Sequence, residues 1–129
     1  MFIPIDINEN SSEPLYAQIT NQLRALILSG YLDEGMLLPS IRELSHQLRC
    51  SVITVRRVYQ DLEGEGLLRT KQGTGTFVAP VGIGEREQYR KRAVEEALVA
   101  AIEAAMRVEM SAAELAHMLE DLIRQKKMK

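Results

Sequence analysis

Two helix starts in close succession constrain the fold more than any other feature of the sequence. Residues 40–43 read Ser-Ile-Arg-Glu, a capping box in which serine and glutamate satisfy each other's end-of-helix donors. The helix that it opens must be short, because Ser51 is already a second N-cap. The sequence therefore predicts a helix over 41–48, a tight turn at 49–50 and a further helix over 52–63.

The apolar residues around this pair predict a supporting bundle. An earlier helix is expected to begin with a cap at Ser12 and Pro14 in its first turn, and to stop at Gly30. Each of the three helices carries an inner stripe at three- and four-residue steps. The stripes comprise Leu15, Ile19, Leu23, Leu26 and Ile27, then Ile41, Leu44 and Leu48, then Val55, Val58, Tyr59 and Leu62.

A change of period after Gly66 predicts a β-hairpin. Residues 67–70 and 76–79 have strand character and flank the glycine-containing loop 71–75. The tip glycines have two interpretations: they permit positive φ in a tight hairpin, or they let backbone N–H groups approach a phosphate or the minor groove.

The resulting order is helix, short helix, tight turn, helix, hairpin, which is typical of a winged helix-turn-helix. In that arrangement the second helix of the pair can enter the major groove of DNA. Arg56, Arg57 and neighbouring polar residues fall outside the inner stripe and have side chains that bind bases or phosphates. The alternative is a solvated helix face whose arginines pair with Glu43 and Asp61.

The overall charge does not by itself favour a nucleic-acid partner. Sixteen basic residues face eighteen acidic ones, which gives a net charge of −2. Between residues 36 and 60, however, four arginines accompany one glutamate, so the basic charge is concentrated in the predicted helix-turn-helix.

Four blocks of the sequence, 13–19, 38–44, 51–59 and 73–78, resemble in order and spacing the winged helix-turn-helix of GntR-type bacterial transcription regulators. The short helical tail resembles the YtrA-type branch. The resemblance implies DNA contacts by Arg42, Ser51, Thr54, Arg56 and Gly73. With the residues inferred above, the expected DNA-binding set is Arg42, Ser51, Val52, Thr54, Arg56, Arg57, Gln72, Gly73 and Thr74.

One position departs from the family pattern. Val52 stands where relatives often carry a polar or basic base-reading residue, and valine offers no hydrogen bond. Val52 and Ile53 can instead touch thymine methyl groups, so we expect an operator different from that of arginine-bearing relatives.

The linker-like stretch 80–84 divides the chain into an expected DNA-binding domain, 1–80, and a helical tail, 81–129. Within the first, the helix-turn-helix occupies 40–63 and the wing 67–79. Two tail helices cannot bury a substantial core alone, so we expect them to pair with a second subunit; folding back onto the first domain is the alternative. The expected dimerisation residues are Val94, Leu98, Ala101, Ile102, Ala105, Leu115, Leu119 and Leu122.

The fold class is therefore mainly α with a small β-hairpin. A single cysteine excludes a disulfide framework, and neither a metal nor a cofactor is expected. The sequence shows no secretion signal and no membrane span, which favours the cytoplasm.

The function predicted is a dimeric, sequence-specific transcription regulator, a repressor on a palindromic operator. A winged-helix protein-interaction adaptor is the alternative, and an enzyme is disfavoured because no nucleophile–base pair is recognisable. The tail leaves little room for a small-molecule effector.

Overall fold

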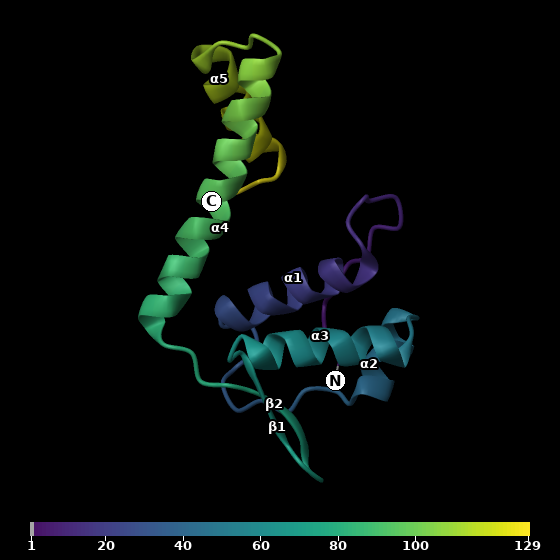
Figure 1. Cartoon of the computed structure of the whole chain (residues 1–129). Coiled ribbons are helices and arrows are strands. Elements are labelled where there is room, and N and C mark those ends of the chain that lie inside the picture. The colour runs from purple at the N-terminus through teal and green to yellow at the C-terminus, as the bar shows by residue number, and fades with distance from the viewer. Residues whose placement is uncertain (1) are drawn as a thin grey trace. The chain divides into compact units, whose positions relative to one another are not determined.

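The computed structural model describes residues 2–129, which form five helices and one two-stranded antiparallel sheet (Figure 1). The predicted class, mainly helical with a small hairpin, is confirmed. The elements are α1 (Leu15–Leu28), α2 (Ile41–Leu48), α3 (Val52–Gly64), β1 (Leu68–Lys71), β2 (Gly75–Val78), α4 (Ile83–Arg107) and α5 (Ala112–Gln125). They divide into two compact units, residues 1–87 and 88–129.

The boundary between the units lies inside α4, whereas the sequence prediction places it at the stretch 80–84. The first turn of α4 stays with the first unit because Arg86 forms an ion pair with Glu34, 3.5 Å away, and its guanidinium approaches Gly30. A helix can continue across such a boundary because its backbone hydrogen bonds are local.

The core of the first unit is built by α1, α2 and α3. Ile19, Leu23, Ile27, Leu44, Val55, Val58 and Leu62 have no exposed surface, which confirms the centres of the three predicted stripes. Burial of one such side chain stabilises the fold by about 1.5–3 kcal/mol. The stripe residues at helix ends and edges, Leu15, Leu26, Ile41 and Leu48, are half-buried.

The caps of α2 and α3 are as predicted, but that of α1 is not. Ser40 and Glu43 form the reciprocal capping box, and the Ser51 hydroxyl accepts a hydrogen bond from Thr54 N at 3.1 Å. No side chain caps α1, so the prediction of Ser12 was wrong. The reason is that Pro14 itself occupies the N-cap position, and its carbonyl accepts the N–H of Gln18 at 3.1 Å.

An extended arm over residues 2–8, which the sequence patterns did not reveal, runs along α1 and α2. Three glutamines hold it, each through its side-chain amide. Gln47 on α2 accepts from Ile3 N and donates to Ile3 O, and Gln22 on α1 does the same for Asp6. Gln18 binds Asn8 likewise. Because Ile3 is fully buried, the arm connects α1 and α2 through both backbone and core contacts.

The wing is a hairpin with a third extended segment beside it. Its strands pair from Leu68↔Val78 to Lys71↔Gly75, one residue closer to the tip than predicted at each strand. Residues 35–38 add backbone bonds to β2, among them Leu38 N to Thr76 O at 2.9 Å. Gly73 has φ +80°, and a Cβ on Gly75 would lie 2.8 Å from Leu37. Turn geometry and packing therefore account for both tip glycines.

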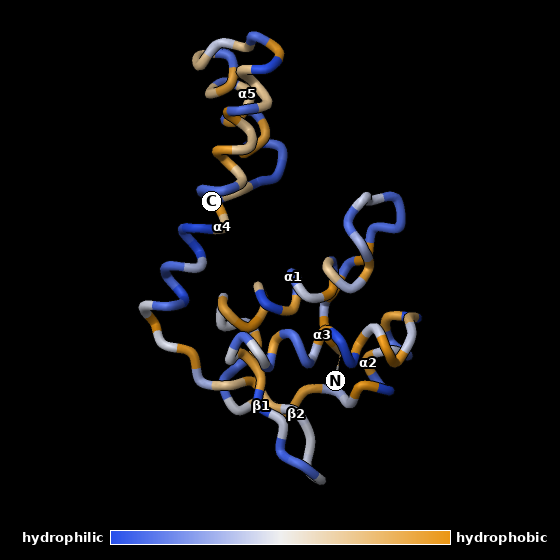
Figure 2. Tube along the Cα trace, viewed as in Figure 1, coloured by the Kyte–Doolittle hydropathy of each residue, from blue (hydrophilic) through white to orange (hydrophobic). Residues whose placement is uncertain are grey.

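The second unit contains most of α4 and all of α5. Ser111 caps α5, and the preceding turn places Glu109 in the left-handed region, at φ 57°, without a glycine. Figure 2 shows hydrophilic residues in the early turns of α4 and recurring hydrophobic residues further along α4 and in α5. Large apolar side chains on both helices are exposed, including Val94, Leu98, Ile102, Leu119 and Leu122.

Candidate nucleic-acid interface

One face of α3 is exposed and carries the residue types that read DNA. Ile53, Arg56 and Gln60 are exposed and recur at three- and four-residue steps, so their side chains share this face; Val52, four residues before Arg56, is half-buried at its edge. Ile53, in the first turn of the helix, is 75% exposed. At the start of the same helix the hydroxyls of Ser51 and Thr54 lie 2.8 Å apart.

The first turn of α2 brings Arg42 to the same region. Arg42 and Val52 line one surface hollow of about 560 Å³, together with Ser45, His46, Arg49 and Cys50. Within residues 2–129, neither Arg42 nor Arg56 forms an ion pair, so both guanidinium groups can bind an external anion. The alternative, in which the arginines of this face pair with Glu43 and Asp61, therefore does not hold for Arg42 and Arg56 within residues 2–129.

Two ionisable groups beside the interface are already engaged. Hydrogen bonds from Ser40, first its backbone N–H and then its hydroxyl, lower the pKa of Glu43, so this carboxylate is charged at neutral pH and serves as part of the cap. Burial raises the pKa of the Cys50 thiol, which keeps it protonated and poorly nucleophilic.

A buried hydrogen bond fixes α2 relative to α3. The Tyr59 hydroxyl donates to Pro39 O at 2.7 Å, directly before the Ser40 cap. Burial, with a contribution from the charge of Glu43, raises the pKa of Tyr59, so the phenol stays a donor. The sequence predicted Tyr59 as an inner-stripe residue but gave no sign of this bond. Through it, α3 is tied to the residue directly before the cap of α2.

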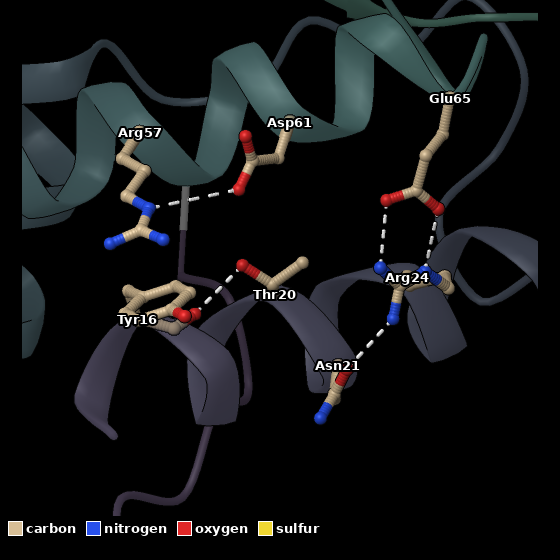
Figure 3. Close-up of polar contacts among 7 residues, drawn as sticks. All are labelled: Tyr16, Thr20, Asn21, Arg24, Arg57, Asp61 and Glu65. Carbon is tan, nitrogen blue, oxygen red and sulfur yellow. Dashed lines mark hydrogen bonds and ion pairs between the residues drawn. The ribbon is translucent and has the colours of Figure 1, made fainter. Parts of the chain in front are cut away.

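Arg57 faces a different neighbour from Arg56. Consecutive helical residues point about 100° apart, and Arg57 turns toward α1, where its guanidinium carbon lies 3.5 Å from the centre of the Tyr16 ring. Its Nε is 4.0 Å from Asp61 Oδ2 (Figure 3). The structure thus places Arg57 in the contact between α1 and α3 and does not bring it together with the other predicted DNA-binding residues.

The same contact is reinforced about two helical turns further along. Arg24 on α1 binds both carboxylate oxygens of Glu65, at 2.8 and 2.7 Å, and also Asn21 Oδ1 (Figure 3). These polar contacts hold α3 against α1 on the flank that carries Arg57. The flank that carries Arg56 remains open.

The wing tip presents the remaining predicted residues. Gln72, Gly73 and Thr74 are exposed, and Thr74 N donates to Lys71 O at 3.0 Å to close the turn. Figure 1 shows the hairpin extending beyond the three helices of the first unit. The structure therefore brings Arg42, Ser51, Val52, Thr54 and Arg56 to one region and places the tip on a projecting element.

No group of three or more His, Cys, Asp or Glu side chains in residues 2–129 is arranged to hold a metal ion; His117 pairs instead with Asp121 at 3.6 Å. Over the same residues, no helix combines the length and the apolar character needed to cross a membrane.

A three-helix bundle with a helix-turn-helix, followed by a hairpin wing, defines the class of winged helix-turn-helix proteins. The family model described as bacterial regulatory proteins, gntR family, matches residues 15–78. This stretch contains the whole interface described above. The chain belongs to the GntR family of bacterial regulatory proteins.

Individual relatives agree with this assignment. The HTH-type transcriptional repressor YtrA of Bacillus subtilis is 40% identical over 75 residues, which cover 58% of this chain and 58% of that protein. The solved structure of YtrA from Sulfolobus acidocaldarius, a GntR-family transcription factor, has 32% identity and a TM-score of 0.57, and the match covers 74% of this chain and 97% of that one. The DNA-binding domain of AraR, solved in complex with operator ORX1, has 34% identity and a TM-score of 0.52 over 57% of this chain and 92% of that one.

Proposed function

We propose that the chain is a sequence-specific DNA-binding repressor that acts as a dimer on a palindromic operator. The observation that carries this proposal is the open face of α3, on which Arg56 has no ion-pair partner in residues 2–129 and Ile53 is exposed to 75%. An apolar side chain in that position can contact a thymine methyl group. Since a bacterial chromosome lies in the cytoplasm, the proposed function places the chain there.

Each group of interface residues has a distinct proposed role. Arg42 and the first turn of α3, with Ser51 and Thr54, bind phosphates, because an arginine and free helix N–H groups both favour an anion. Arg56 binds a base edge or a phosphate, and Val52 with Ile53 selects thymine. Gln72, Gly73 and Thr74 at the wing tip contact the adjacent minor groove or backbone.

The operator-bound AraR domain supports DNA as the partner. That domain matches 57% of this chain. Repression is supported by the name of the Bacillus relative, a transcriptional repressor. A protein that covers a promoter by occupying an operator needs no catalytic group, so binding alone is sufficient for the proposed activity.

Dimerisation is proposed from the exposed apolar residues of the tail. Val94 is 60% and Ile102 49% exposed, and Leu98, Leu119 and Leu122 are similarly uncovered. Ala101 is exposed and permits close approach of a second helix. Ala105 is already buried within the single chain and Leu115 on α5 is half-buried, so the prediction that Ala105 itself faces a second subunit is corrected. Two copies would place two recognition helices about 34 Å apart, one turn of DNA, which favours a palindromic site.

The test compares two adjacent arginines on an operator obtained by binding-site selection from random duplexes. We expect Arg56→Ala to weaken operator binding by about 1–3 kcal/mol, because it removes a base or phosphate contact. Arg57→Ala is the matched control: it should leave affinity within about twofold and instead lower stability by about 0.5–1 kcal/mol through loss of the stacking on Tyr16.

Fluorescence anisotropy measures affinity, and urea unfolding measures stability. If selection enriches no sequence, and Arg56→Ala binds DNA as wild type does, the DNA-binding proposal fails. The winged-helix adaptor would then be the better explanation.

A further inference from the structure

A hollow with cationic walls lies along one face of α2 and beside the start of α3. Its lining includes Arg42 and Arg49 and contains no acidic residue; the others are Ser45, His46, Cys50 and Val52. Within residues 2–129 neither arginine forms an ion pair. Two guanidinium groups without ion-pair partners around one depression of about 560 Å³ favour an anion there.

Arg49 occupies this position on a backbone better suited to glycine. It closes α2 at φ 54°, ψ 49°, in the left-handed region, while Cys50 N donates to Ser45 O at 3.0 Å. A side chain in this conformation is strained, and glycine adopts it freely. The turn thus needs only the backbone of residue 49, and the arginine side chain adds nothing to it.

Left-handed backbone alone does not identify a functional residue. Glu109 and Lys127 also have positive φ, in turns of the tail. Arg49 differs from both because its side chain lines a cationic hollow beside the exposed face of α3. Arg49 is distinguished by the position of its charge and not by its backbone strain.

We propose that Arg49 is a further DNA-binding residue, which together with Arg42 holds a backbone phosphate of the operator in this hollow. The inference rests on the proposed function. In helix-turn-helix proteins the first helix of the pair crosses the DNA backbone while the second lies in the major groove. The end of α2 is therefore the place where a phosphate passes, and a planar guanidinium matches its oxygens with two parallel hydrogen bonds.

A phosphate contact predicts a loss that does not depend on DNA sequence. Removal of one charge–phosphate contact should lower the slope of log affinity against log salt by about one, and should weaken binding about fivefold at 0.15 M salt. The loss should be the same on a selected operator and on a duplex of random sequence. A base contact would instead affect the operator alone.

The experiment uses Arg49→Gly, which deletes the side chain and also relieves the left-handed strain. We expect weaker binding with the reduced salt slope, together with a melting temperature equal to or above that of wild type. Arg49→Lys keeps the charge and should retain the salt slope. Glu109→Gly gives the same backbone relief in the tail and should leave DNA affinity unchanged.

The outcomes separate the two proposals. If wild type binds DNA and Arg49→Gly binds equally well with the same salt slope, the phosphate site is refuted while the DNA-binding function stands. A loss confined to the selected operator would also refute it. If wild type binds neither duplex, the proposed function fails and the inference fails with it.

Discussion

Among single residues, Tyr59 shows how one buried polar group can orient an interface without touching the ligand. Its hydroxyl reaches the carbonyl of Pro39, immediately before the helix that presents Arg42. A buried carbonyl that loses its donor is left unsatisfied, and the penalty then exceeds the net contribution of the hydrogen bond itself. We therefore expect Tyr59 to act as a positioning residue for Arg42.

We expect Tyr59→Phe to lower the free energy of unfolding by about 1–3 kcal/mol, because Pro39 O remains buried without a donor. Chemical denaturation measures this change. If Tyr59 positions Arg42, Tyr59→Phe should also weaken DNA binding by the folded protein. Arg42→Ala should then reduce DNA affinity less in the Tyr59→Phe background than in wild type. Additive losses in this double-mutant cycle would contradict the positioning role.

Two neighbouring arginines of α3 have different surroundings. Arg56 and Arg57 are identical in type and adjacent in sequence, yet Arg57 stacks on Tyr16 and Arg56 does not. The sequence pattern placed both outside the inner stripe, which was correct. It did not separate them, because Tyr16 comes from another helix.

At the scale of elements, the N-terminal arm is the contact that local patterns could not reveal. Its three glutamines reproduce, with side-chain amides, the paired backbone hydrogen bonds of a strand. Two of them belong to α1 and one to α2, so the arm joins the first helix to the helix-turn-helix. The burial of Ile3 shows that this attachment includes the core.

We expect Ile3→Ala to destabilise the first unit by about 2–4 kcal/mol, because it opens a cavity under the arm. Urea unfolding measures the loss. Asp6→Ala is the control, since Asp6 binds Gln22 through its backbone and its side chain is exposed. The control should change stability by less than about 0.5 kcal/mol. Equal stability of Ile3→Ala and wild type would mean that the arm does not contribute to the core.

At the scale of the whole molecule, the exposed apolar residues of the tail bear on the oligomeric state. The second unit exposes large aliphatic side chains on both of its helices, and among the described residues of α4 Ala105 alone is buried. Exposed apolar surface of this kind marks an interaction site. The proposed partner is a second copy, since two recognition helices are needed for a palindromic operator.

We expect Leu98→Asp to shift the protein from dimer to monomer and to weaken operator binding at least tenfold, because a charge in the seam must be desolvated on association. Sedimentation velocity and anisotropy measure the two effects. Glu103→Lys lies on the opposite side of α4 from the seam at residues 94, 98, 101 and 105 and should stay dimeric. A wild type that sediments as a monomer at micromolar concentration would refute the dimer.

Much of the first unit follows from local sequence signals. The capping serines Ser40 and Ser51, the inner stripes and the shift to strand period are visible within windows of a few residues, and the helices and hairpin formed where these signals are. The prediction that Ser12 caps α1 was wrong because α1 begins without a side-chain cap. Pro14 occupies the N-cap position and starts the helix through its backbone geometry.

The amino-acid order by itself determined the elements, the turn between α2 and α3 and the types of residue on the exposed face of α3. Tertiary structure decided which of these residues are free to bind DNA. The bonds from Gln47 to Ile3 and from Tyr59 to Pro39 connect residues 44 and 20 positions apart, beyond the reach of helical or strand periodicity. Local backbone preferences act over one or two turns, whereas a side chain's partner is chosen by which elements pack together.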